Sequence, residues 1–173
     1  MTNTLIYIDE TDRSYGLSGM AVTLAALNSE EKILEINIDR SPDPIDFVPD
    51  FYFFGNPRFS AKHVWDELAQ NFQLSLAMAL GNLLSRRQVG ADAALTDLEI
   101  QTLREIAEDE GAEICGLEAD EFEEIWDKDL RYVQRIFSIP SVRRLTRALA
   151  EELRQRRSLS RHEFLELLAR YNR

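Results

Sequence analysis

The chain has 173 residues and a formal net charge of −11 at pH 7, with 45% hydrophobic and 29% charged residues. This balance excludes an intrinsically disordered protein, and the length suits one domain with a sizeable core. A single cysteine, Cys115, excludes an internal disulfide, so we expect a reducing, cytoplasmic location. The chain start lacks a secretion-signal pattern and no apolar run could span a bilayer, so we expect no membrane partner.

The first 30 residues predict a strand followed by a helix. Residues Thr4 to Asp9 are mostly β-branched or aromatic, which predicts a short buried strand. A polar connection follows, and the stretch from Gly16 to Asn28 then predicts a helix. Gly16 and Gly19 are small enough to let this helix pack closely against a neighbouring element.

Two further strands are expected before residue 60. Apolar and polar residues alternate from Lys32 to Asp39, which predicts a half-buried strand. Its expected inward face consists of Leu34, Ile36 and Ile38. Three prolines make residues 41–50 a connection, and the aromatic run over residues 51–54 predicts a third strand.

The stretch from Ala61 to Arg87 predicts a long helix, because its apolar residues recur at helical spacing. In its second half, apolar residues face almost every direction, which is typical of a helix surrounded by other elements. Ser60 is placed to cap its first turn, and the helix should end near Gln88 to Gly90. We therefore expect the other elements to assemble around this helix.

Three later helix starts share one pattern, a capping box with flanking apolar residues. The pairs are Thr96 with Glu99, Ser160 with Glu163 and, with a carboxylate in place of the hydroxyl, Glu118 with Glu121. Gly111 is expected to end the first of these helices, and Pro140 should separate the next helix from its successor.

A candidate metal site rests on the two predicted strands, which both end in Ile-Asp, at Asp9 and Asp39. If these strands are parallel neighbours, both carboxylates lie at the carboxyl edge of the sheet, where open α/β sheets place ligands. Together with Asp12, they could hold Mg²⁺ through carboxylate oxygens and waters. The alternative is that each Asp merely ends a strand and starts a turn.

Charge is unevenly distributed, with net −13 in residues 91–130 and net +7 in residues 131–173. We expect these segments to attract each other, within one chain or between copies, because guanidinium groups bind carboxylates bidentately. The arginines assigned to this interaction surface are Arg143, Arg147, Arg154, Arg156 and Arg157. They could also contact the phosphates of a nucleic acid, but the acidic chain as a whole opposes such binding.

No set of residues specifies a reaction. The two histidines, His63 and His162, each fall in the first turn of a predicted helix, and Cys115 lies between acidic segments that disfavour its thiolate. The loop from Ser14 to Gly19 matches neither a phosphate-binding loop nor a nucleophile elbow. We assign no catalytic residue and, apart from the Mg²⁺ hypothesis, no cofactor.

Together these patterns predict a predominantly helical α+β protein forming one domain over residues 1–173. Residues 1–59 make a small α/β portion with about three strands and one helix, and residues 60–173 make a bundle of about five helices around the central hydrophobic helix. The leading functional hypothesis is a non-enzymatic interaction or scaffold protein that self-associates. The alternatives are a Mg²⁺-dependent enzyme or small-ligand sensor using Asp9 and Asp39, and then a nucleic-acid binder using the arginine-rich helices.

Overall fold

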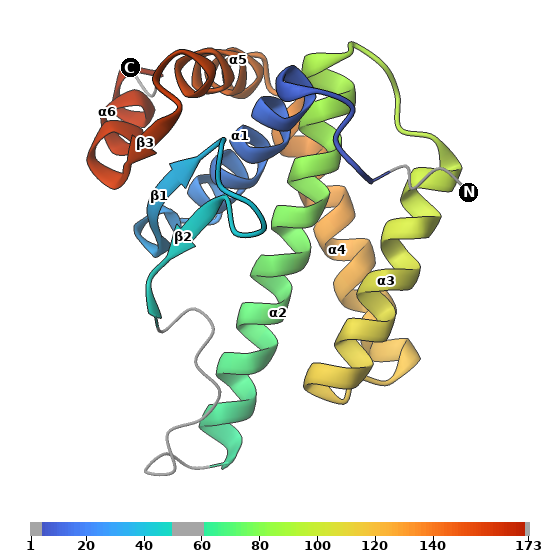
Figure 1. Ribbon diagram of the computed structural model, residues 1–173. Helices are drawn as coiled ribbons and strands as arrows, with labels where there is room; N and C mark the ends of the chain where they lie inside the picture. Colours follow the sequence, from blue (N-terminus) through green and yellow to red (C-terminus); the bar gives the residue numbers. More distant parts are fainter. Residues whose placement is uncertain (1–4, 50–60, 172–173) are drawn as a thin grey trace.

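The computed structural model describes residues 5–49 and 61–171, with side chains described from residue 68 onward in the second range. Within these residues the chain forms six α-helices and a three-stranded antiparallel sheet, so the predicted α+β fold is confirmed (Figure 1). The helices are α1 (Glu10–Ala26), α2 (Ala61–Leu84), α3 (Asp97–Cys115), α4 (Ala119–Ser138), α5 (Pro140–Arg156) and α6 (Arg161–Tyr171). Of the helices in the described residues, none has the length and apolar character needed to cross a bilayer.

Helix α2 runs through the middle of the molecule, as predicted. The sheet, α1, α5 and α6 lie on one side of it, and α3 and α4 lie on the other (Figure 1). After Leu84 the helix continues as one π-helical turn, η3 (Ser85–Gly90), so its expected end near Gly90 is confirmed. The proposed cap, Ser60, lies outside the described residues.

Close contact between α1 and α2 depends on glycine. A methyl group at Gly19 would collide with Ser85 and with the backbone of Gly81, and one at Gly81 would collide with Thr23. Only the absence of side chains at both glycines lets the two backbones come this close. The predicted close packing around Gly19 is therefore confirmed.

The strand expected over residues 4–9 is not formed in its described part. Residues 5–9 make a turn, and Asp9 instead caps α1, with its side chain accepting a hydrogen bond of 2.7 Å from the Asp12 backbone N–H. A strand needs a neighbouring strand to pair with, whereas here the side chain of Arg86 binds the carbonyl groups of Leu5 and Ile6. Helix α1 consequently begins at Glu10, six residues before the predicted Gly16.

The sheet consists of β1 (Ile33–Asn37), β2 (Ile45–Phe47) and β3 (Ser158–Ser160), in the order β2-β1-β3, and both pairings are antiparallel. A 3₁₀ turn, η1 (Glu30–Lys32), precedes β1. The prediction of β1 is confirmed, but its face pattern is wrong at Leu34, which is 40% exposed while Ile33 is fully buried. The pairing of β1 with β2 shifts register between Ile33 and Glu35, and this irregularity turns Ile33 rather than Leu34 inward.

Two of the strands lie where the sequence pattern did not place them. β2 falls within the proline-rich stretch predicted to be a connection. It is an edge strand, the position in a sheet that tolerates flanking prolines such as Pro44. β3 is only three residues long and directly precedes α6, so it carries little periodicity of its own. The strand predicted over residues 51–54 lies outside the described residues.

The predicted helix starts are confirmed. Thr96 and Glu99 form a complete capping box at α3, and Ser160 and Glu163 form one at α6. At α4, Glu121 accepts a hydrogen bond of 3.0 Å from the backbone N–H of Glu118. Pro140 separates α4 from α5 as expected, being the first residue of α5.

The predicted end of α3 at Gly111 is wrong. The helix continues to Cys115 and ends at Gly116, which has the left-handed conformation, φ 64°, that favours glycine. Gly111 instead gives room to Phe72 of α2, whose ring atom Cζ would lie 2.9 Å from a methyl group at this position. Its small size thus serves the contact between two helices.

Two hydrophobic clusters are formed by the described side chains, and α2 contributes to both. Leu74 and Met78 of α2 belong to the cluster that joins α1, the sheet, α5 and α6. Leu76 and Leu80 of the same helix belong to the cluster that α2 forms with α3 and α4. Because the two sets alternate along α2, this helix holds the two sides of the fold together.

Candidate functional site

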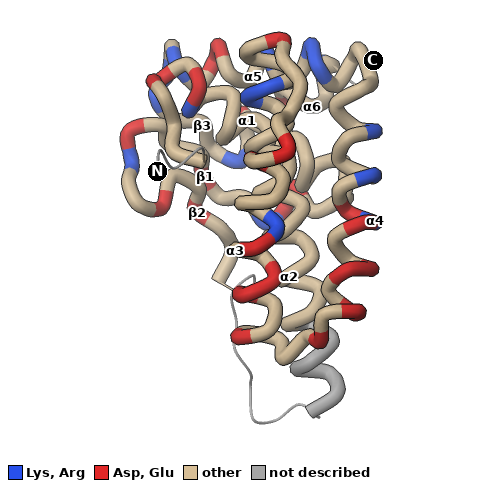
Figure 2. The backbone as a smooth tube through the Cα atoms, turned by 90° about the vertical axis from the view of Figure 1, so that its right-hand side faces the viewer, with Lys and Arg blue, Asp and Glu red and all other residues tan. Residues whose placement is uncertain are grey.

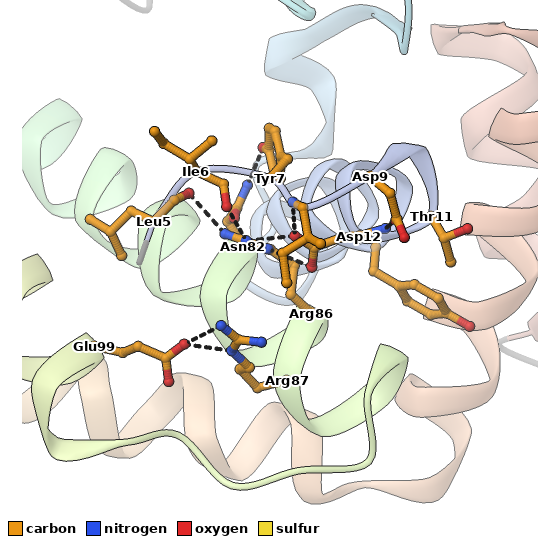
Figure 3. Close-up of polar contacts among 12 residues, drawn as sticks. Leu5, Ile6, Tyr7, Asp9, Thr11, Asp12, Asn82, Arg86, Arg87 and Glu99 are labelled. Atoms are coloured by element: carbon orange, nitrogen blue, oxygen red, sulfur yellow. Dashed lines mark hydrogen bonds and ion pairs between the residues drawn. The ribbon is translucent and has the colours of Figure 1, made fainter. Parts of the chain in front are cut away.

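Arg86, in the π-helical turn η3, is the largest of the fully buried side chains in the described residues, with 2% of the residue exposed. It forms a bidentate pair with Asp12, at 2.8 Å from Nε to Oδ1 and 2.6 Å from Nη2 to Oδ2. It also donates hydrogen bonds of 3.0 and 2.9 Å to the carbonyl oxygens of Leu5 and Ile6 (Figure 3). All three nitrogens are therefore engaged, and we call this group the arginine clamp.

The clamp explains why residues 5–9 follow a turn over the end of α2. The side chain of Asp12 also accepts a 2.9 Å hydrogen bond from the backbone N–H of Ile8. Burial raises the pKa of Asp12, but the hydrogen bonds from Arg86 and Ile8 outweigh burial and hold this pKa below its ordinary value. Asp12 therefore keeps its charge opposite Arg86.

Tyr7 lies beside the clamp. Its ring centroid is 4.8 Å from the guanidinium carbon of Arg86 and 5.5 Å from that of Arg13, both within the range of cation-π attraction. The phenol oxygen accepts a 2.6 Å hydrogen bond from Nδ2 of Asn82 in α2 (Figure 3). Gly16 of α1 makes room for this contact, since a methyl group there would lie 2.6 Å from the Tyr7 ring.

A cavity of about 450 Å³ opens between the clamp, the loop after β1 and the second half of α2. Most of its lining is apolar, and Tyr7, Arg13, Ser75, Asn82 and Arg86 supply the polar groups. Its volume falls in the range of sites for small organic molecules, as does this mixture of apolar walls and a few polar groups. The arginine clamp and this cavity form the candidate site.

A second arginine of η3, Arg87, connects α2 to α3. Its Nε donates a 2.5 Å hydrogen bond to Oε1 of Glu99, the residue that closes the capping box of α3 (Figure 3). Burial raises the pKa of Glu99, but the hydrogen bonds from Thr96 and then Arg87 outweigh it, so this pKa is lowered. The π-helical turn thus fixes both the N-terminal segment and the start of α3.

The three carboxylates of the Mg²⁺ hypothesis have separate partners. Asp9 caps α1, Asp12 pairs with Arg86, and Asp39 pairs with Arg157. The hypothesis is conditional on a parallel pair of strands, and this condition is not met, because residues 5–9 form no strand and both pairings of the sheet are antiparallel. Across the described residues, no group of three or more His, Cys, Asp or Glu side chains is arranged to hold a metal ion.

Arg157, in the turn after α5, forms ion pairs with Glu10 at the start of α1 and with Asp39 after β1. It donates 3.0 Å from Nε to Asp39 and 2.8 Å from Nη1 to Glu10. The hydrogen bond from Arg157 lowers the pKa of Asp39 despite some desolvation, and the same cause lowers the pKa of Glu10. Both carboxylates therefore form ion pairs with Arg157.

Four of the five arginines assigned to the interaction surface are engaged within the chain. Besides Arg157, Arg143 donates to the Gln88 carbonyl oxygen at 2.5 Å, Arg154 donates to Thr11 at 3.2 Å and Arg156 pairs with Glu152 at 2.6 Å. Arg147 is exposed and has no ion pair within the described part of the chain. Of these five arginines, Arg147 is therefore the one whose guanidinium group has no hydrogen bond or ion pair to the described residues.

Sequence reasoning missed Arg86, Tyr7 and Asn82. A signal for Arg86 was present, because it lies three residues after Leu83 and seven after Ala79, on a stripe of the helix that is otherwise apolar. A charged residue on such a stripe indicates a buried ion pair. Its partners could not be identified, since Asp12 is 74 positions away.

Comparison of the chain with known protein families, curated proteins and solved structures identifies no significant match. No family model matches the chain, and neither a curated protein nor a solved structure shows significant similarity to it. Its function is therefore argued from the geometry above.

Proposed function

We propose that this protein is a non-enzymatic interaction protein that associates with copies of itself through oppositely charged surfaces. The observation that carries the proposal is that the acidic and basic segments do not neutralise each other inside the chain. In the described residues, one ion pair joins them between different elements, Arg143 with Asp92 at 3.2 Å. A second, Arg131 with Asp127, lies within α4 itself.

The first of the two surfaces is acidic and lies on the second half of α3 and the start of α4. Its carboxylates are exposed and have no hydrogen bond or ion pair to any described residue. They belong to Asp109, Glu110, Glu113, Asp120 and Glu124, which we call the acidic surface. Ile106 and Ile114 of α3 are also 44% and 46% exposed, so the region offers apolar contacts as well.

The second surface is basic and lies on α5 and α6. Arg144, Arg147 and Arg170 are exposed, and none has an ion pair to the described residues; we call them the basic surface. Arg144 and Arg147 line a shallow hollow together with Tyr171, and Arg170 lines an adjoining hollow that shares this tyrosine. Tyrosine and arginine are both enriched at protein interfaces.

The two surfaces lie toward opposite ends of the molecule. Figure 2 shows acidic residues predominating along the lower parts of α3 and α4, and many of the basic residues near α5 and α6. A contact between unlike ends is heterologous, so it generates closed rings or open chains rather than a simple two-fold dimer. Association should therefore rise with concentration and weaken with salt.

A charge exchange tests this proposal. The double variant Arg144→Glu/Arg147→Glu carries acidic groups at both ends, and Glu110→Arg/Glu113→Arg carries basic groups at both ends. Each alone should remain monomeric at tens of micromolar in low salt, whereas a mixture of the two should associate, as measured by light scattering after gel filtration. Lys128→Glu/Arg135→Glu, which makes the same change of charge at two exposed positions outside the basic surface, is the control for Arg144→Glu/Arg147→Glu and should still associate.

Two results would contradict the proposal. One is a wild-type protein that is monomeric at tens of micromolar in both low and moderate salt. The other is association that persists equally in both double variants, since contacts other than the charged surfaces would then hold the copies together.

A further inference from the structure

We infer that the cavity beside the arginine clamp binds a small amphipathic carboxylate, with the carboxylate at Arg13 and Tyr7 and the apolar body along α2. This inference is independent of self-association. It rests on the shape of the cavity, on hydrogen-bonding capacity that the described residues leave unused, and on the chemistry of the walls.

Arg13 is the cation with unused capacity. Its Nη2 donates a 2.5 Å hydrogen bond to the Arg40 carbonyl oxygen, and no carboxylate in the described residues lies within ion-pair distance of it. Its Nε is buried and has no hydrogen-bond partner among these residues. Such a donor gains free energy when an acceptor enters and the side chain adjusts to it. An anionic acceptor gains more, because the bond is then charge-assisted.

Tyr7 supplies a second donor next to Arg13. Its oxygen already accepts a hydrogen bond from Asn82, so its own O–H remains available to donate. Arg86 also lines the cavity, but all its nitrogens are engaged by Asp12 and the carbonyl oxygens of Leu5 and Ile6. The polar end therefore presents donors and positive charge, which is complementary to a carboxylate.

The rest of the cavity suits a flexible apolar body. Met20 and Met78 contribute unbranched side chains that adapt to different shapes, and Leu83 and Leu103 add aliphatic surface. Ser75 of α2 lies on the lining as well and is half-buried. Donors together with apolar walls distinguish this cavity from a site for a free phosphate or a sugar, which would need polar groups all round.

Decanoate is the first probe, and decanol, which has the same chain length without the charge, is its control. We expect decanoate to bind one molecule per chain in isothermal titration calorimetry and decanol to bind about tenfold more weakly, because decanol lacks the charge-assisted bonds. Arg13→Met keeps an apolar stem but removes the charge, so it should lower the affinity for decanoate to that for decanol. Arg13→Lys should recover part of the difference.

Two further variants test the location. Ser75→Trp adds a large ring to the lining and should block both probes, whereas Arg135→Met removes an exposed arginine elsewhere and should change neither affinity. Circular dichroism melts show whether each variant is folded before its binding is compared. Failure of both probes to bind the folded wild-type protein would overturn the inference, and so would equal binding of decanoate and decanol that Arg13→Met leaves unchanged.

Discussion

Two buried charged residues near α2, Arg86 in the η3 turn and Asp129 in α4, differ in how many of their polar atoms have hydrogen-bond partners. Arg86 is 2% exposed and meets the carboxylate of Asp12 and two backbone carbonyl groups. Asp129 of α4 is 5% exposed and receives a single hydrogen bond, 3.0 Å from Nε2 of Gln73, while its Oδ2 is buried without a partner in the described residues. The two side chains are thus similarly buried, but every nitrogen of Arg86 has a hydrogen-bond partner whereas one carboxylate oxygen of Asp129 has none in the described residues.

The pKa directions follow this difference. Burial raises the pKa of Asp129, and the hydrogen bond from Gln73 does not offset it. At Asp12, Arg86 reverses the effect of burial and the pKa is lowered. Burial of a charge is therefore compatible with stability at the clamp, where Arg86 forms an ion pair with Asp12. It is unfavourable at Asp129, which forms no ion pair in the described residues and feels only the weaker attraction of Lys128.

Replacing Arg86 with Met should have the largest effect on this comparison. The variant removes the counter-ion of the buried Asp12 carboxylate and the hydrogen bonds that Arg86 donates to two backbone carbonyl groups, so the free energy of unfolding should fall by roughly 3 kcal/mol. Urea unfolding followed by circular dichroism measures this loss. Arg87→Met is the matched control, because Arg87 also pairs with a buried carboxylate, that of Glu99, but its own side chain is 22% exposed and binds no backbone carbonyl group in the described residues. Its loss should therefore be smaller.

A second variant separates charge from packing at the clamp. Adding Asp12→Asn to Arg86→Met removes the unpaired carboxylate and should recover part of the lost stability. If Arg86→Met and Arg87→Met lower the free energy of unfolding equally, the deeper burial of Arg86 makes no difference to the strength of its ion pair and the comparison fails.

At Asp129 the expected sign is opposite. Asp129→Asn removes a buried charge whose burial the attraction of Lys128 does not offset, and it keeps a side chain of the same shape. It should therefore raise the free energy of unfolding at pH 7 by on the order of 1 kcal/mol. Glu124→Gln on the exposed face of α4 is the control and should change stability much less. A loss of stability in Asp129→Asn would show that the carboxylate has a favourable partner.

Acid should act on the two sites in opposite directions. Asp129 has a raised pKa in the fold, so its penalty appears as pH rises above its ordinary value of 3.8, and the advantage of Asp129→Asn should widen over this rise and then level off. Asp12 has a lowered pKa, so its contribution is present above 3.8 and is lost as pH falls through its folded value. Unfolding curves from acidic to neutral pH measure both changes.

Local signals in the sequence predicted the helices well. The capping pairs Thr96 with Glu99 and Ser160 with Glu163 form as expected, because each depends on residues three positions apart. Pro140 likewise acts within its own turn. Gly111 shows the limit of this reasoning, since its role is set by Phe72 on another helix.

The candidate site was not predictable in the same way, because it depends on contacts between distant segments. The carbonyl oxygen of Leu5 and Nη1 of Arg86 are separated by 81 positions, and Asp39 and Arg157 by 118. A carboxylate at the end of an apolar run indicates that it needs a partner but does not say whether the partner is a metal ion, a helix N-terminus or an arginine. The metal hypothesis for Asp9 and Asp39 depended on a parallel pairing of their strands, which the fold does not contain: residues 5–9 form no strand and the sheet is antiparallel.

Arg157 extends the comparison to a charge that is paired but exposed, and its variants should have the smallest effect. Its φ of 71° is a conformation that favours glycine, and its carbonyl oxygen accepts a 3.0 Å hydrogen bond from Ile38. Arg157→Ala loses the ion pairs and keeps the backbone strain, whereas Arg157→Gly loses both.

The glycine variant should therefore melt higher than the alanine variant by roughly 2 to 4 °C. The advantage of the wild-type protein over Arg157→Ala should shrink with added salt, because its exposed ion pairs are screened whereas the clamp at Arg86 is not. Equal melting of the two variants would mean that the turn carries no strain. The opposite result would be a difference in melting temperature between the wild-type protein and Arg157→Ala that added salt leaves unchanged. The ion pairs of Arg157 would then resist screening as buried pairs do, and burial would not explain the difference between Arg157 and Arg86.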